Sequence, residues 1–330
     1  MGVSTVCEMP VGREMRGLVA VPLIALRSVR RVEADLYVYC MNSQRPVLYQ
    51  RAGTRLTGDQ ADALEAAGNR CLYVCVGEFN RVGKQLLASL STLLENDDIT
   101  PAERYGVLQT AVSAEVEHAV KLVHCDRFVK LSSDVARHIR SLVESRQLLP
   151  HDLFRIARHD YHTFAHVTNV ASYAVMLALQ TGLADGDDLE RLAVAAMLHD
   201  LGKRYVPRHV LLKPGPLNPS ERALIETHTQ RGYESLLHRN DVDFDQLMVV
   251  YQHHERIDGR GYPVGVTGEE IHPWAQLIAV VDVFDAMTGT RTYRRAASVA
   301  QARDGLLKRG GTHLNQELVE CWTSMLTTLS

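Results

Sequence analysis

The sequence predicts an α+β protein in three segments: a small mixed β-rich domain (residues 1–78), a helical connector (79–150) and an all-α helical bundle (151–330). Three observations lead to this prediction. Short runs of β-branched and aromatic residues occupy the first segment, apolar residues recur near a period of 3.6 in the second, and the third combines helix-start signals with short loops. A chain of 330 residues can hold two domains, or one domain with a large appendage.

The first segment begins with an apolar run, Leu18–Leu26. The run is far shorter than the roughly 20 residues that span a bilayer, and it lacks the order of a signal peptide. We therefore expect a buried strand here, and a soluble, cytoplasmic protein that does not enter a membrane.

Further along the first segment, Leu36–Cys40 and Val47–Gln50 are β-rich runs around a polar turn and predict a hairpin. Residues 71–76 predict another strand. Between these runs, Thr57 and Gln60 have the spacing of a capping box and predict a helix through about residue 67. Gly68 follows as the expected stop signal.

The second segment is predicted to be helical. Apolar residues near a 3.6-residue period are Val107, Ala111, Ala114, Val116, Ala119, Val120 and Val123. Two interpretations stay open for this segment. In one, it connects a sensor to an effector or pairs with a second copy in a homodimer. In the other, it is the helical part of one continuous core.

The third segment is helical with loops at residues 213–216 and 258–263. Asn218 is the predicted N-cap of one helix, with Pro219 at the first helical position and Glu221 at the third. This helix carries His228.

Charge and cysteine content exclude several classes of protein. The 36 basic and 39 acidic residues give a net charge of -3, so no global field favours nucleic acid or a membrane surface. An anionic substrate must therefore be held by local cations. The six cysteines contain no C-x-x-C pair and indicate reduced thiols in a cytosolic protein rather than a disulfide framework.

Histidine and aspartate residues cluster in the third segment in a pattern typical of metal ligands. The candidates are His166, His199, Asp200, His228, His253, His254 and Asp282. Adjacent helical residues point about 100° apart, so His199 and Asp200 suit a crevice between helices, or a carboxylate that bridges two ions. The set is too large for one ion and about right for two. Taken alone, His166 would be read as a hydrogen-bonded core residue.

Two carboxylates in an apolar stretch support this interpretation. Asp282 lies within residues 277–287, where a buried carboxylate requires a cation. Asp285 follows three residues later near the same face, and is a candidate to hold a metal ligand in position without binding the metal itself.

The segment from His253 to Pro263 resembles the signature of the HD-GYP family, a branch of the HD phosphohydrolase superfamily. Gly261, Tyr262 and Pro263 form the tripeptide that gives the family its name. Supporting stretches lie at residues 212–215, 268–271, 282–288 and 291–294. The resemblance covers about residues 150–330.

The resemblance implies an HD-type helical domain with a two- or three-metal centre and phosphodiesterase activity on cyclic di-GMP, a bacterial second messenger. It implies the seven metal ligands named above, with Asp200 as the bridge. Lys203 would reach the scissile phosphate, and Arg291 and Arg294 would hold phosphate oxygens. Asp200 and Lys203 are thus the expected catalytic residues, and Gly261–Pro263 the expected substrate contact.

The shell of imidazoles and carboxylates suits divalent iron, manganese, cobalt, nickel or zinc, and the softness of the ligands alone does not choose among them. Iron or manganese is the expected metal. Two positions depart from the family pattern. Thr292 stands where the family often has Pro, a change expected to be tolerated. His162, four residues before His166, stands where trinuclear members carry Glu; it either binds a third ion or leaves a two-metal site.

The leading hypothesis is attack on phosphorus by a hydroxide that bridges two metal ions, giving linear pGpG, GMP or both. Two alternatives stay open. One is a non-catalytic receptor that binds cyclic di-GMP or a signalling protein through the Gly261–Pro263 loop. The other is an HD hydrolase acting on a different cyclic dinucleotide or nucleotide. The amino-terminal segment is expected to regulate or dimerise the protein.

Overall fold

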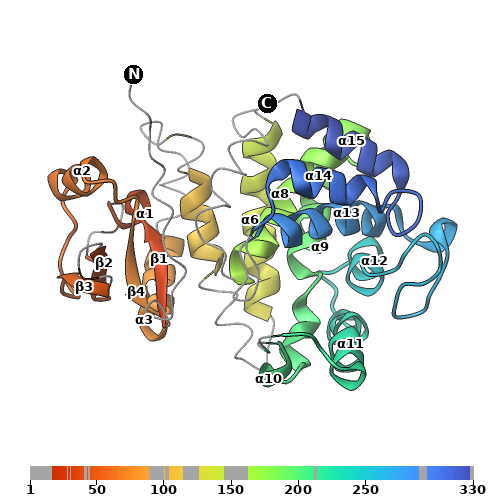
Figure 1. The fold of residues 1–330 in the computed structure, drawn as a ribbon, viewed down its shortest axis with the longest axis horizontal. Coiled ribbons are helices and arrows are strands. Elements are labelled where there is room, and N and C mark those ends of the chain that lie inside the picture. The colour runs from red at the N-terminus through yellow and green to blue at the C-terminus, as the bar shows by residue number, and fades with distance from the viewer. Residues whose placement is uncertain are drawn as a thin grey trace. The chain divides into compact units, whose positions relative to one another are not determined.

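The structure, a computed structural model, describes residues 17–27, 29, 31–40, 43, 45–88, 100, 104–113, 126–144, 163–211, 213, 215–289 and 296–327. Contacts divide the chain into two compact units, residues 1–118 and 119–330 (Figure 1). The first unit contains a small antiparallel sheet and the second is helical, which confirms the predicted α+β class. The three-part division at residues 78 and 150 stays a prediction.

The sheet of the first unit has the strand order β1-β4-β2-β3. Its strands are β1 (Leu18–Pro22), β2 (Leu36–Cys40), β3 (Arg45–Gln50) and β4 (Cys71–Cys75). β2 and β3 form the predicted antiparallel hairpin, with Cys40 opposite Arg45. β1 pairs with β4, and β4 pairs with β2, also antiparallel.

The prediction of one strand over Leu18–Leu26 is wrong in its second half. β1 ends at Pro22, and helix α1 (Leu23–Arg27) follows. Pro22 lies opposite Cys71, the first residue of β4, so beyond Pro22 the chain has no strand to pair with in this direction. Leu23, Ala25 and Leu26 of α1 are buried, and a short apolar run does not distinguish a buried strand from a buried helical turn.

Helix α2 (Gly58–Ala66) confirms the predicted capping box. The Thr57 side chain accepts a hydrogen bond from the Gln60 backbone N–H, and the Gln60 side chain accepts one from the Thr57 N–H. Gly68 follows at φ +85°, a conformation that favours glycine.

The described part of the connector region is almost entirely helical. α3 (Val76–Ala88), a helix over residues 104–113 and α6 (Asp126–Glu144) lie there. Val107 and Ala111 are fully buried, in agreement with the predicted apolar face, while the periodic residues from 114 to 123 lie outside the described residues. None of the described helices is long and apolar enough to cross a membrane.

The second unit packs its helices around α8. Its helices after α6 are α8 (Thr163–Thr181), α9 (Gly186–Leu198), α10 (Arg208–Leu211), α11 (Pro219–Leu236), α12 (Phe244–Gln252), α13 (Pro273–Thr288), α14 (Val299–Leu307) and α15 (Gln316–Thr327), with 3-10 turns η2 (Leu201–Tyr205) and η3 (Gly268–Glu270). α8 contacts α6, α9, α13 and α15. The rings of Tyr173, Phe284 and Trp322 meet in this core at centroid distances of 5.4–5.7 Å.

The start of α11 is as predicted. The Asn218 side chain accepts from the Glu221 backbone N–H, the Glu221 side chain accepts from the Asn218 N–H, and Pro219 stands at the first position. This cap fixes the helix that carries His228.

Candidate metal centre

Both pairs of adjacent candidate ligands lie at helix ends. α9 ends at Leu198, so His199 caps the helix and Asp200 lies in the turn before η2. α12 ends at Gln252, so His253 is its cap and His254 follows. Because the chain turns at these points, neighbouring side chains can approach the same cavity from one segment.

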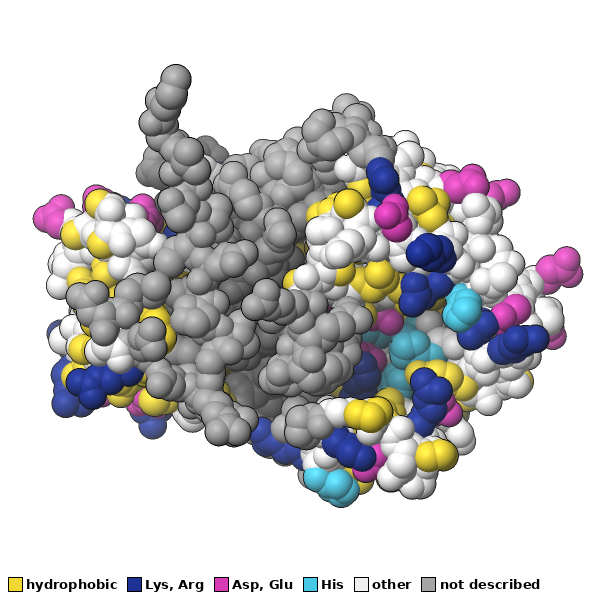
Figure 2. Space-filling view, in the orientation of Figure 1, with side chains coloured by type: hydrophobic (Ala, Val, Ile, Leu, Met, Phe, Trp, Pro, Cys, Tyr) yellow, Lys and Arg dark blue, Asp and Glu magenta, His cyan; other side chains and the backbone are white. Residues whose placement is uncertain are grey.

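The structure brings all seven candidate ligands together, from five helices. They form two clusters, and within each cluster the donor atoms lie within 4.8 Å of one another. The His166 group consists of His166, His199 and Asp282; the His228 group consists of Asp200, His228, His253 and His254. Figure 2 shows histidine side chains gathered in a hollow of the second unit, with acidic and basic side chains beside them.

Asp200, a member of the His228 group, also faces the His166 group. Its Oδ2 is 3.4 Å from His199 Nε2 and 3.7 Å from His166 Nε2. Its Oδ1 is 3.4 Å from His228 Nε2 and 3.9 Å from His253 Nε2. Each carboxylate oxygen therefore faces a different group, which is the arrangement that a carboxylate bridging two ions requires.

Backbone carbonyls orient three of the imidazoles. His199, His228 and His253 each place Nδ1 against a carbonyl oxygen of their own helix, so Nδ1 carries the proton and donates it. The contacts are His199 to Ala196 at 2.6 Å, His228 to Ile225 at 2.7 Å, and His253 to Val249 and Val250 at 3.1 Å each. In this tautomer Nε2 is left with a lone pair directed into the centre.

The donor atoms fit a cation. His228 Nε2 and His253 Nε2 lie 3.3 Å apart although both carry lone pairs, and both face the Asp200 carboxylate. Among the described side chains, His199 Nε2 and Asp200 Oδ1 are buried without a hydrogen-bond partner. Such a cluster of acceptors is costly unless positive charge lies among them. Neutral imidazole and carboxylate are the ligands of borderline divalent metals.

The protonation states suit metal binding as well. Burial lowers the pKa of His228 to about 4 and that of His254 to about 3, so both are neutral at pH 7. Burial alone would raise the pKa of the Asp200 carboxyl. The positive charge of Lys203 and the contact with His199 outweigh this effect and hold the pKa well below its ordinary value.

Lys203 lies at the mouth of the centre. It belongs to η2, and its Nζ is 2.5 Å from Asp200 Oδ2. The Lys203 side chain is 36% exposed while that of Asp200 is 11% exposed, so the ammonium group lies between the buried carboxylate and solvent.

The loop after α12 places Tyr262 against the centre. The Tyr262 ring packs on His254 at a centroid distance of 4.9 Å and lies 6.2 Å from the His228 ring. Gly261 is required for this path, because a Cβ at Gly261 would lie 2.4 Å from the Cα of Glu255. The predicted Gly261–Pro263 segment is thus next to the candidate ligands.

Glu255 anchors this loop, a role that sequence reasoning missed. The side chain is buried, and its carboxylate accepts hydrogen bonds from the backbone N–H groups of Val264 at 2.7 Å and Gly265 at 3.0 Å. In the sequence, Glu255 stands in a charged stretch that resembles a solvated face. Its partners come from residues nine and ten positions later, in a loop whose path no periodicity predicts.

Replacing Glu255 by Ala is expected to destabilise the second unit by about 1–2 kcal/mol, because the loop loses the buried carboxylate that accepts from two of its backbone N–H groups. Urea unfolding followed by tryptophan fluorescence measures this, since both tryptophans, Trp274 and Trp322, are buried in the second unit. Glu269→Ala, at an exposed position of the same region, is the control and should change stability by less than about 0.5 kcal/mol. Equal stability of the two variants would contradict the anchoring role.

Three predicted site residues lie outside the described residues. They are His162, Arg291 and Arg294. Their predicted roles, and that of the departure at Thr292, stay predictions.

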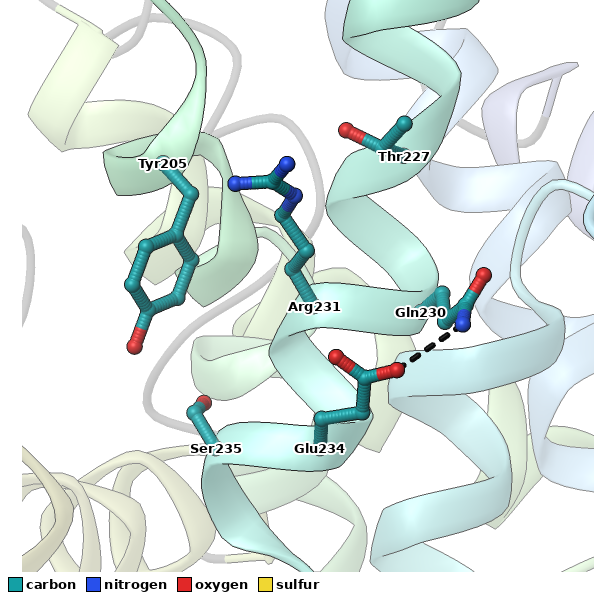
Figure 3. Close-up of a pocket in the computed structure, with 6 residues that line it drawn as sticks. All are labelled: Tyr205, Thr227, Gln230, Arg231, Glu234 and Ser235. Atoms are coloured by element: carbon teal, nitrogen blue, oxygen red, sulfur yellow. Dashed lines mark hydrogen bonds between the residues drawn. The ribbon is translucent and has the colours of Figure 1, made fainter.

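A separate hollow of about 570 Å³ lies between η2 and α11 (Figure 3). Tyr205 and Arg231 face each other across it, and Gln230 donates a hydrogen bond to Glu234. None of the seven candidate ligands lines it, and its charged side chains are exposed. This hollow is therefore distinct from the candidate metal centre.

A profile of the HD domain family matches residues 152–318. The chain belongs to the HD domain family. This agrees with the resemblance to HD-GYP proteins drawn from the sequence. The matched region contains all seven described candidate ligands, Lys203 and the Gly261–Pro263 loop.

Curated relatives share this part of the chain. A cyclic di-GMP phosphodiesterase of Pseudomonas aeruginosa, PA4108, is 38% identical over 191 residues, which are 57% of this chain and 44% of the relative. The cyclic di-GMP phosphodiesterase response regulator RpfG of Xanthomonas campestris pv. campestris is 35% identical over 190 residues, 56% of this chain and 50% of RpfG. The 3'3'-cGAMP-specific phosphodiesterase 2 of Vibrio cholerae is 36% identical over 160 residues, 48% of this chain and 30% of that enzyme. The chain thus spans half or less of the length of these relatives.

Among solved structures, Bd1817, an HDG"Y"P protein from Bdellovibrio bacteriovorus, has a similar fold. The TM-score is 0.66 at 19% identity, and the match covers 94% of this chain and 99% of Bd1817. The likeness therefore extends beyond the HD domain.

Proposed function

We propose that this protein is a metal-dependent phosphodiesterase that hydrolyses cyclic di-GMP to linear pGpG, GMP or both. The observation that carries the proposal is the position of Asp200, whose two oxygens face two separate groups of metal-ligand side chains. A single-ion site would not need a carboxylate directed to both sides. A structural ion pair would not leave buried lone pairs directed at one another.

The residues that would hold two divalent ions are the His166 group on one side and the His228 group on the other, with Asp200 shared. Two ions held there would lower the pKa of a bound water and stabilise charge on the leaving oxygen of a phosphodiester. Iron or manganese is the proposed metal, although the mixed shell of imidazole and carboxylate also suits cobalt, nickel or zinc. The proposal uses two ions, and His162 is the candidate ligand if a third ion binds.

The chain supplies the substrate contacts. Lys203, at the mouth of the centre, is placed to neutralise charge that develops on a phosphoryl oxygen. Tyr262 offers a ring beside the ligands on which a nucleobase can stack. Arg291 and Arg294 are proposed to hold the phosphate oxygens, as in the sequence-based hypothesis.

Replacing Lys203 by Met is expected to lower turnover of cyclic di-GMP about 10²-fold, because methionine keeps an unbranched side chain of similar volume but removes the charge. Steady-state kinetics on the metal-loaded protein measures the effect. Lys308→Met, at an exposed lysine after α14, is the matched control and should keep wild-type turnover. Equal turnover of the two variants would remove Lys203 from the proposed mechanism.

A second substrate has support from a specific observation, because 3'3'-cGAMP-specific enzymes are among the relatives at a similar identity. The metal-loaded protein should be given cyclic di-GMP, 3'3'-cGAMP and cyclic di-AMP together, and the linear products separated by mass. We expect the product of cyclic di-GMP to form fastest. Preferential loss of 3'3'-cGAMP would identify that substrate instead, and binding without any product would favour the non-catalytic receptor.

Two partner roles complete the proposal. The loop containing Gly261–Pro263 is proposed as a contact for a signalling protein. The amino-terminal unit or the connector is proposed as the site of homodimerisation and regulation.

A further inference from the structure

His166 differs from the other oriented imidazoles of the centre in what lies behind it. Its Nδ1 is 2.7 Å from Asp285 Oδ2, whereas the Nδ1 atoms of His199, His228 and His253 face backbone carbonyls. A carboxylate behind a histidine ligand fixes the tautomer and increases the basicity of the ligating nitrogen more than a carbonyl does.

Asp285 is itself held in place. Its side chain is only 1% exposed, and Asn169 donates from Nδ2 to Asp285 Oδ1 at 2.9 Å. His166 and Asn169 are three residues apart on α8, and Asp282 and Asp285 are three residues apart on α13. Each pair therefore lies on one face of its own helix, and these faces of α8 and α13 contact each other at the His166 group.

The His166 ring is enclosed by this arrangement. Nδ1 faces Asp285, and Nε2 lies 3.1 Å from Asp282 Oδ1. Because the buried, anchored carboxylate of Asp285 binds Nδ1, the His166 ring cannot rotate, and its Nε2 stays directed toward Asp282. Asp285 belongs to neither ligand group and contacts the centre through His166, so its role is to position that ring.

The two groups also differ in charge. Among the described residues, the His166 group has the carboxylate of Asp282, that of Asp285 behind it, and Asp200 Oδ2, an oxygen that also pairs with Lys203. The charge of Lys203 offsets that of Asp200, so the carboxylates of Asp282 and Asp285 leave this group negative. The His228 group has three imidazoles and only the shared Asp200 carboxylate. Oxygen-rich, negatively charged sites favour hard divalent ions such as manganese, while imidazole-rich sites do not.

We propose that Asp285 and Asn169 are positioning residues that make the His166 group the tighter of two unequal metal sites, which fills before the His228 group. This inference rests on the proposed two-metal centre. It adds the order in which the two metal sites fill. It attributes that order to Asp285 and Asn169, which bind no metal themselves.

The test is titration of the metal-free full-length protein with Mn²⁺, with the free ion set by a competing chelator. Wild type should bind two ions in two distinguishable steps. Asp285→Asn, which keeps the shape of the side chain but removes its charge, should weaken the tighter step about 10- to 100-fold and leave the weaker step in place. Asn169→Ala, which keeps the carboxylate but frees it to rotate, should weaken the same step by a smaller factor.

Two further variants make the assignment specific. His228→Ala should remove the weaker step and leave the tighter one. Thr323→Val removes a buried hydroxyl that donates to the Val319 carbonyl on α15, and should change neither step. Tryptophan fluorescence shows whether each variant is folded, and if Asp285→Asn is not, Asn169→Ala alone decides the inference.

The inference is overturned if Asp285→Asn and Asn169→Ala bind both ions as wild type does, or if they weaken the step that His228→Ala removes. It is also overturned if wild type binds two ions with equal affinity. The readout is metal binding, so it separates this inference from the proposed activity. A protein that shows the ordered titration but hydrolyses no cyclic dinucleotide would contradict the proposed function alone.

Discussion

Asp200→Asn is expected to lower hydrolysis of cyclic di-GMP by at least about 10³-fold, the largest effect of any single substitution in the centre. The side chain keeps its shape, but an NH2 group replaces one of the two oxygens, and the negative charge that faces both groups is lost. Metal content should fall along with activity, because the shared ligand is weakened on both sides. Product formation and bound metal are measured on the same preparation.

The matched control for this variant is Asp187→Asn. The Asp187 side chain is 96% exposed and pairs with Arg140 at 2.9 Å on the surface of the second unit. Such a pair contributes little, so activity and metal content should stay at the wild-type level. An Asp200→Asn protein that kept full metal content and turnover would show that the bridging role is wrong.

Gly202→Ala is expected to have the largest effect on stability, at about 3 kcal/mol. A Cβ at position 202 would lie 1.8 Å from the His228 carbonyl oxygen and 2.6 Å from the Gly232 nitrogen. Both contacts are with the backbone of α11, so no side chain can move aside. Either η2 or α11 must shift, and the shift separates Lys203 from His228.

Urea unfolding followed by tryptophan fluorescence measures the change, with Gln230→Ala on the exposed face of α11 as the control. The control should stay within about 0.5 kcal/mol of wild type. A Gly202→Ala protein as stable as the control would mean that η2 and α11 are not held in this close contact.

Local patterns predicted the parts of the fold that local chemistry determines. The capping boxes at Thr57 and Asn218 depend on hydrogen bonds between residues three apart, and both are present. The strand predicted through Leu26 failed because its end is set by a partner, β4, that lies some fifty residues away in the sequence. The domain boundaries depend on long-range packing in the same way.

The candidate ligands were predictable because a histidine or aspartate in apolar surroundings is costly to bury unless it binds a cation or a polar partner. The sequence did not predict which atoms of these side chains face one another. The ligands divide into two groups around Asp200 because five helices, distant in the sequence, come together in the fold. Glu255 illustrates the limit, since its partners are backbone groups that carry no sequence signal. The contact of Gly202 with α11 is hidden in the same way.

The most direct test of a two-metal phosphodiesterase is hydrolysis of cyclic di-GMP as a function of bound metal. Metal-free protein is loaded with Mn²⁺ from zero to two ions per chain, and linear product is measured at each content. We expect turnover to stay low up to one ion and to rise as the second binds. Full turnover with one ion or none, or no linear product at two ions per chain, would contradict a two-metal mechanism.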